Sequence, residues 1–236
     1  TLYYQMEMEV ITDKLEIPWA IDFTGANKIL VTERPGRLRI IENGQLLDEP
    51  VRNTPEVLHE GQGGLLDVKV DPEYEENGWI YLAYSHELKD QKQEDRTPAM
   101  TRIVRGKIKN NTWTTQEVLF EAPHETYRTT RHHYGCRIVF DPDRHLYFSI
   151  GDRGAKEQAQ DLSRPNGKIH RINPDGSIPK DNPFLDHKEA LPSIFAYGSR
   201  NAQGLATHPE TGEIWETEHG PMGGDEINVI QSGKNY

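Results

Sequence analysis

One strand–turn–strand unit recurs along the chain and constrains the fold more than any other feature. In each copy, an alternating apolar run meets a turn, and a run rich in aromatic and β-branched residues follows. The four copies begin at Ala20, Asp67, Arg137 and Gly204. The last three carry a proline after the first run, at Pro72, Pro142 and Pro209. Alternation with a period of two predicts strands with one buried face, and the breaks predict turns between them.

The spacing of these units decides between two all-β architectures. Successive prolines are 70 and 67 residues apart, which suits a propeller blade of about four strands with its connecting loops. A β-sandwich also has many short strands, but its strands recur without so long a period. A propeller closes on itself to cover its edge strands, whereas this sequence stops at Tyr236 after about four units. We therefore expect one β-propeller domain over residues 1–236, truncated at its C-terminal end.

Charge and cysteine content exclude several classes of partner and site. The 27 basic and 38 acidic residues give a net charge of −11, which argues against a nucleic acid or an anionic membrane as the main partner. No apolar stretch approaches the roughly 20 residues that a spanning helix needs, so no membrane insertion is expected. The single cysteine, Cys136, excludes an internal disulfide framework and a cysteine-based zinc site.

Two polar clusters contain candidate residues for proton transfer. His132 and His133 lie just before a predicted strand, and histidine titrates closest to neutral pH, which suits removal of a proton from a hydroxyl. Adjacent residues of an extended chain point to opposite faces, so only one of them should face a given pocket. Asp152 follows the next strand pair, where it could orient an imidazole. Alternatively, these are two surface histidines and an aspartate in a Gly-flanked turn.

Three further clusters could bind a ligand or a cation. Glycines around Gln62 allow close approach of a ligand, or form an ordinary loop. Arg200 and Asn201 place a planar cation and an amide between glycines, to bind a carboxylate or an oxyanion, or to cap loop carbonyls. Glu218–Glu226 sets carboxylates beside a Gly-Pro bend, which could bind calcium or be only an acidic turn.

In their residues and in their order along the chain, these clusters resemble one family, the soluble PQQ-dependent aldose sugar dehydrogenases (glucose/sorbosone dehydrogenases). The resemblance runs from about Ile17 to the last residue. The matching phrases include Gly61-Gln-Gly-Gly-Leu-Leu, His133-Tyr-Gly-Cys-Arg, Ile150-Gly-Asp, Gly198-Ser-Arg-Asn-Ala-Gln-Gly and Asp225-Glu-Ile-Asn. Two positions depart from the family pattern: His132 stands where some members have an aspartate, and Cys136 stands at a frequent glycine.

The resemblance implies a quinoprotein dehydrogenase on a six-bladed propeller, of which this chain holds about four blades. His133 aligns with the general base that removes the proton from the anomeric hydroxyl of an aldose. A hydride then passes from the sugar C1 to pyrroloquinoline quinone (PQQ), and the sugar leaves as its lactone. Asp152 aligns with an aspartate near that base, and Arg200 with a catalytic arginine near the reacting quinone oxygen.

The resemblance also implies the residues that hold PQQ and calcium. The cofactor contacts are Gln62, His133, Arg200 and Asn201. The carbonyls of Gly220 and Pro221 match ligands of the calcium ion that holds the cofactor. Glu226 and the carbonyl of Tyr236 match a separate structural calcium site.

Two alternative functions stay open from the sequence: a calcium-dependent propeller lactonase and a non-catalytic recognition propeller. The combination of His133 and Asp152 with Arg200 and Asn201 favours the dehydrogenase over both. Its expected partners are an aldose sugar and an external electron acceptor. We expect a monomer or homodimer that is periplasmic or secreted, with no signal peptide in this sequence.

Overall fold

The computed structural model describes residues 6–91 and 95–236, and within these ranges the chain is nearly all β. Its strands form four antiparallel sheets. The first two sheets contain β1 (Pro18–Gly25), β2 (Lys28–Glu33), β3 (Arg37–Glu42) and β4 (Gln45–Leu46), then β5 (Leu65–Val70), β6 (Ile80–Glu87), β7 (Ala99–Lys109) and β8 (Thr112–Glu121). The other two contain β9 (Ile138–Phe140), β10 (Leu146–Ile150), β11 (Lys168–Ile172) and β12 (Ile194–Tyr197), then β13 (Ala202–Thr207), β14 (Ile214–Glu218) and β15 (Glu226–Ile230). The helical elements are α1 (Tyr74–Asn77), η1 (His124–Thr126) and η2 (Lys156–Gln160).

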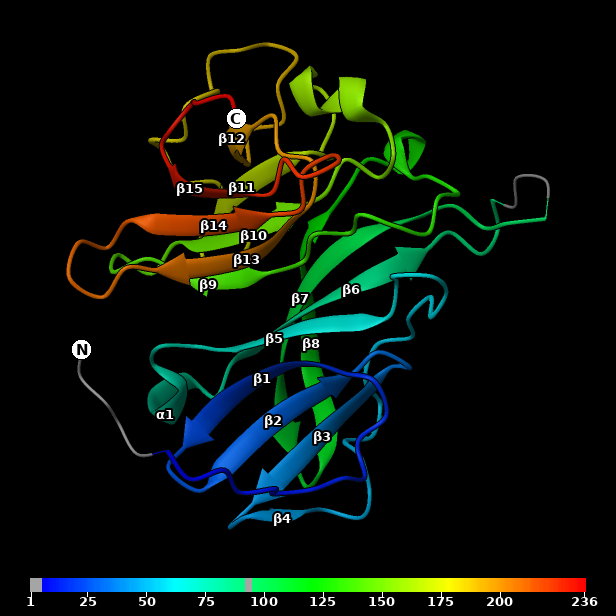
Figure 1. Cartoon of the computed structure of the whole chain (residues 1–236), viewed down its shortest axis with the longest axis vertical. Helices are drawn as coiled ribbons and strands as arrows, with labels where there is room; N and C mark the ends of the chain where they lie inside the picture. Colours follow the sequence, from blue (N-terminus) through cyan, green and yellow to red (C-terminus); the bar gives the residue numbers. More distant parts are fainter. Residues whose placement is uncertain (1–5, 92–94) are drawn as a thin grey trace.

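The arrangement of the sheets is that of consecutive propeller blades. Within each sheet the strands neighbour one another in chain order. The first strand of each sheet contacts the first strand of the next, from β1 to β5, β5 to β9 and β9 to β13. Figure 1 shows the first sheet at the bottom of the view, the second across the middle, and the third and fourth in the upper half. The all-β propeller with about four blades is therefore confirmed, and the sandwich alternative is wrong.

The repeated prolines lie in the turns between the first and second strands of the last three sheets. The residue before each proline accepts hydrogen bonds from the turn backbone. Asp71 Oδ1 accepts from the N–H of Glu73 at 2.9 Å, and Asp141 Oδ1 accepts from the N–H of His145 at 2.7 Å. In the fourth sheet, the Nδ1 atom of His208 takes this part. In each repeat, a hydrogen-bond acceptor is therefore followed by a proline, whose φ angle is fixed. Together the two residues form the turn that ends one strand and leads to the next.

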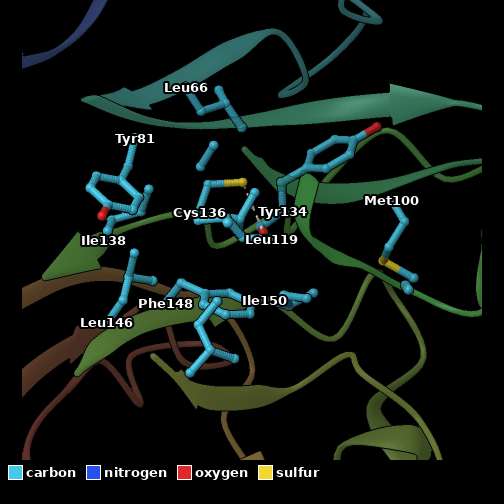
Figure 2. Close-up of a cluster of buried hydrophobic side chains, with 14 of the residues drawn as sticks. Leu66, Tyr81, Met100, Leu119, Tyr134, Cys136, Ile138, Leu146, Phe148 and Ile150 are labelled. Atoms are coloured by element: carbon cyan, nitrogen blue, oxygen red, sulfur yellow. Dashed lines mark hydrogen bonds between the residues drawn. The ribbon is translucent and has the colours of Figure 1, made fainter. Parts of the chain in front are cut away.

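The apolar core lies between successive sheets, and its largest part joins the second sheet to the third. Figure 2 shows Cys136 at the centre of this cluster, between Leu66 of β5 and Phe148 of β10. Burial raises the pKa of Cys136 to about 12, so the group remains a thiol and packs as a small apolar residue. Two smaller clusters fill the interfaces on either side.

The connections carry little helix. Among the described residues no helix is long and apolar enough to cross a membrane. The loop between Glu87 and Ala99 connects β6 to β7. Residues 92–94 of that loop lie outside the described residues.

Candidate active site

The propeller topology gathers the predicted site residues at one end of the molecule. Gln62 lies between β4 and β5, His133 between β8 and β9, and Arg200 and Asn201 between β12 and β13. Each of these connections leads from the last strand of one sheet to the first strand of the next. Asp152 follows β10, which runs antiparallel to β9, so its end lies beside the start of β9. Residues in the connections next to four different strands are thereby brought together.

His133 is held by two hydrogen bonds, one to its backbone N–H and one to its ring. Its N–H donates to Gln62 Oε1 at 2.7 Å, and its Nδ1 lies 2.7 Å from Asp152 Oδ1. An ionised carboxylate only accepts hydrogen bonds, so Nδ1 carries the hydrogen and Nε2 is left as the basic nitrogen. The His133 side chain is 15% exposed. The arrangement can therefore take a proton at Nε2 and stabilise the resulting imidazolium through Asp152.

Asp152 is held in its ionised form. Burial raises its pKa, but hydrogen bonds from His133 and from the N–H of Gly154 outweigh burial and lower the pKa below its ordinary value. The backbone is fixed as well: the Asp152 N–H donates to the carbonyl of Arg200 at 2.7 Å, and Asn166 Nδ2 donates to the Asp152 carbonyl at 2.8 Å. This carboxylate therefore orients the histidine ring at any pH near neutrality.

The expectation that the two adjacent histidines face opposite ways is wrong. His133 has a left-handed backbone conformation, with a φ of 56°, instead of an extended one. The rings of His132 and His133 consequently lie edge to face, with centroids 4.5 Å apart. Burial, and then the charges of His133 and Arg153, lower the pKa of His132. His132 also packs so closely on Gly154 that a Cβ there would lie 2.6 Å from its Nε2. A larger residue at that position would displace the ring.

Arg200 and Asn201 continue the site toward the fourth sheet. Arg200 Nη1 donates to the carbonyls of His219 at 2.6 Å and Gly220 at 3.0 Å. Asn201 is buried, and its Oδ1 accepts from the N–H of Gly135 at 3.2 Å. No ion pair to Arg200 is found in residues 6–91 and 95–236. Its charge is therefore available to an anionic ligand.

Gln62 joins the connection between β4 and β5 to His133. It is exposed, and its N–H donates to the carbonyl of Arg131 at 2.7 Å while its side chain accepts from His133. Gly61 has a φ of 60°, and a Cβ there would lie 2.5 Å from the Arg131 carbonyl oxygen. This glycine therefore permits close approach of the histidine segment itself.

The expected calcium ligands differ in their surroundings. The Gly220 carbonyl accepts from Arg200, and the Pro221 carbonyl accepts from the N–H of Gly224 at 3.0 Å. Glu226 is exposed, and the N–H of Tyr236 donates to the Tyr197 carbonyl at 3.0 Å. In the described part of the chain, no three His, Cys, Asp or Glu side chains are placed to hold a metal ion. A cation here would depend mainly on backbone carbonyls.

Sequence comparison decides the family. A model of the glucose/sorbosone dehydrogenase family matches residues 15–236. The chain belongs to this family.

Several members of known name are similar to this chain. Quinoprotein glucose dehydrogenase B of Acinetobacter calcoaceticus is 32% identical over 259 residues, which cover 98% of this chain and 52% of that protein. The soluble aldose sugar dehydrogenase of Escherichia coli, solved in its apo-form, is 38% identical with a TM-score of 0.89, over 97% of this chain and 64% of that one. The PQQ-bound aldose sugar dehydrogenase of Streptomyces coelicolor is 26% identical with a TM-score of 0.78, over the same shares. The chain spans 52–61% of the length of three curated relatives.

Two buried charged residues of this family member were not predicted from the sequence. Arg153 is fully buried beside Asp152. Glu216 is buried on β14, where burial and then the charge of Glu218 raise its pKa to about 8. The alternation along β14 gave a signal for Glu216, because Ile214 and Glu216 share the inward face. No comparable sequence signal exists for Arg153, since a charged residue in a Gly-flanked turn is usually solvated.

Proposed function

We propose that this chain forms the base-carrying part of a PQQ-dependent dehydrogenase that oxidises the anomeric hydroxyl of aldose sugars to lactones. The observation that carries the proposal is the pair of half-buried His133 and buried Asp152, joined at 2.7 Å beside Arg200. The family and its PQQ-bound relative support it. Neither the lactonase nor the recognition propeller requires such an oriented base next to an unpaired arginine.

In this proposal, His133 acts as the general base. Its Nε2 accepts the proton of the anomeric hydroxyl, and Asp152 stabilises the imidazolium that forms. Gln62 fixes the His133 backbone through the 2.7 Å hydrogen bond to its N–H. This step requires the His133 ring to be neutral when the substrate binds.

The residues at this end of the propeller fit PQQ, which carries three carboxyl groups and an ortho-quinone. Arg200 supplies a cation without an ion-pair partner in the described ranges, and Gln62 and Asn201 supply amides at the same end. When bound there, PQQ supplies the hydride acceptor. Arg200 would stabilise negative charge as it develops on the quinone oxygen.

The oxygen atoms near Arg200 also fit calcium, which prefers carbonyl and carboxylate ligands. The carbonyls of Gly220 and Pro221 each accept one protein hydrogen bond, and each retains a second lone pair. We assign these two carbonyls to the cofactor calcium, and Glu226 with the carbonyl of Tyr236 to a separate structural calcium. The external electron acceptor, the periplasmic or secreted location and the monomeric or homodimeric state stay predictions.

The test is dye-linked glucose oxidation by the full-length protein that contains this chain, with and without PQQ plus calcium. Activity should require both. His133→Ala should lower kcat by about 10²–10⁴-fold, while PQQ binding, followed by absorbance, is retained. His187→Ala, which changes an exposed histidine, is the control and should leave kcat unchanged.

Two results would contradict this proposal. Near-normal turnover of His133→Ala would remove His133 as the base. Absence of activity on every aldose tested, with PQQ and calcium both present, would favour the lactonase or the recognition propeller.

A further inference from the structure

Arg153 is a buried cation with no carboxylate partner in the part of the chain that the structure describes. It is 0% exposed, and none of the ion pairs among the described residues includes it. Burying a charge is costly unless hydrogen bonds or opposite charges compensate. The groups that do compensate Arg153 therefore indicate what it does.

Those groups belong almost entirely to the segment that carries the base. The Arg153 guanidinium donates to the carbonyl of Thr130 at 2.7 Å and to the carbonyl of His132. It also lies 3.5 Å from the centroid of the Tyr134 ring. In the other direction, Thr130 Oγ1 donates to the carbonyl of Arg153 at 2.7 Å. Arg153 thus contacts the histidine segment on both sides of His133.

His133 needs such support because its backbone is left-handed, a conformation that residues other than glycine adopt at a cost. The two consecutive residues Asp152 and Arg153 divide the task. Asp152 binds the ring of His133, whereas Arg153 binds the carbonyl that directly precedes the His133 nitrogen. Both must be in place for Nε2 to have a fixed position.

We propose that Arg153 is a positioning residue for the base: its guanidinium bridges the carbonyls of Thr130 and His132 and stacks on Tyr134, and so fixes the backbone of His133. The inference rests on the proposed role of His133. Lysine could not replace it, because an ammonium is a compact donor without the planar fork that spans two carbonyls and stacks on a ring.

The test compares R153K with R39K in the full-length protein loaded with PQQ and calcium. Arg39 is also buried and also donates to a backbone carbonyl, that of Leu47 at 2.9 Å, but it lies on β3 away from the site. R153K should keep PQQ binding and lower kcat roughly 10- to 100-fold, with a smaller change in KM and an altered acid limb of the pH profile. R39K should leave kcat and the pH profile unchanged, whatever its effect on the melting temperature.

A spectroscopic measurement on the cofactor-free protein separates positioning from a general loss of structure. In the unchanged protein, the His133 Nδ1–H should give a downfield proton resonance, because it is bonded to Asp152 at 2.7 Å. That resonance should weaken or disappear in R153K and persist in R39K. Its assignment comes from its loss in His133→Ala.

The outcomes distinguish this inference from the proposed function. If His133→Ala loses activity but R153K has unchanged kcat, pH profile and resonance, the role of Arg153 is overturned and that of His133 stands. If His133→Ala is active, the base itself is wrong. Should R153K fail to fold, R153Q decides, because its neutral amide buries no charge and cannot bridge the carbonyls of Thr130 and His132. A folded R153Q with unaltered kcat and resonance would also overturn the inference.

Discussion

The interface between the second and third sheets can be compared with the outward faces of the first and fourth sheets. Both regions have large apolar side chains, but the exposure of these side chains differs. In the interface, Phe148 is fully buried against neighbours from both sheets. On the outward faces, Phe23 of β1 is 56% exposed and Ile227 of β15 is 70% exposed. The alternation of residues along the strands places apolar side chains on the interface and on the outward faces alike. Burial of a blade face therefore depends on a neighbouring blade, not on the blade's own sequence.

Two buried carboxylates, both on inward faces of their sheets, differ in how their oxygens are satisfied. Asp67, between the second and third sheets, accepts from Arg137 Nη1 at 2.9 Å and from the N–H of Ile138 at 2.6 Å. Both oxygens of Glu216, in the fourth sheet, are buried without a hydrogen-bond partner among the described residues. The third sheet supplies the partners of Asp67. Packing between blades thus satisfies polar groups as well as apolar ones.

The largest effect is expected for Phe148→Ala. Phe148 stacks on His170 with ring centroids 4.9 Å apart, and truncating a buried phenylalanine costs about 3–5 kcal/mol. Phe23→Ala, on the outward face, should change stability by less than about 0.5 kcal/mol. Chemical denaturation of both variants measures the contrast. Equal losses would break the comparison between the two faces.

Glu216→Gln should remove a pH-dependent destabilisation. Burial, and then Glu218, raise the pKa of folded Glu216 from its ordinary 4.5 to about 8. Below pH 4.5 the carboxyl is neutral in both states and contributes nothing. Between pH 4.5 and 8 the unfolded chain loses the proton that the folded chain keeps, so this group destabilises the folded state increasingly. The variant should therefore match the parent near pH 4.5 and exceed it by a few kcal/mol at pH 8.

Denaturation midpoints at pH 4.5, 6 and 8 check the Glu216 prediction. Glu213→Gln, an exposed change directly before β14, serves as the control and should follow the parent at each pH. A pH dependence shared by Glu216→Gln and the parent would show that Glu216 titrates normally and that its burial carries no energetic cost.

Asp67→Asn tests the satisfied carboxylate. Burial outweighs the charge of Arg137 and raises the pKa of Asp67 to about 6, which still leaves it ionised at pH 7.5. The amide keeps an acceptor for Ile138 and removes a charge whose burial destabilises the folded state at this pH, but it also loses the charge that faces Arg137. Because the pKa of Asp67 is raised less than that of Glu216, the variant should gain less stability at pH 7.5 than Glu216→Gln gains at pH 8. Asp143→Asn, at an exposed position, is the matched change. A larger gain for Asp67→Asn than for Glu216→Gln would break the comparison between the two carboxylates.

The strands that the sequence predicts correctly include those that are apolar and buried along most of their length, such as β6 and β10. The last strands of the sheets were not predicted, and β8 shows why: of Thr112–Glu121 only Trp113 and Leu119 are buried. An outer strand has solvent on much of its surface, so its alternation is weak. Its place in the sheet comes from pairing with β7.

For the candidate site, the sequence indicated residues that the structure brings together, but it did not indicate their geometry. His133, Asp152 and Arg200 could be selected from residue chemistry and order along the chain. The left-handed backbone of His133 could not, because it is held by Gln62, 71 residues away, and by Arg153. Local sequence does not encode a conformation that tertiary contacts impose.

Cys136, buried between the second and third sheets, gives the protein an internal reporter. It is the sole thiol in the sequence, and the folded chain shields it from any reagent in solution. A thiol-specific label can therefore attach only when this interface separates. The labelling rate therefore reports how often the interface separates. It can be measured in the unmodified protein and in every variant that retains the cysteine.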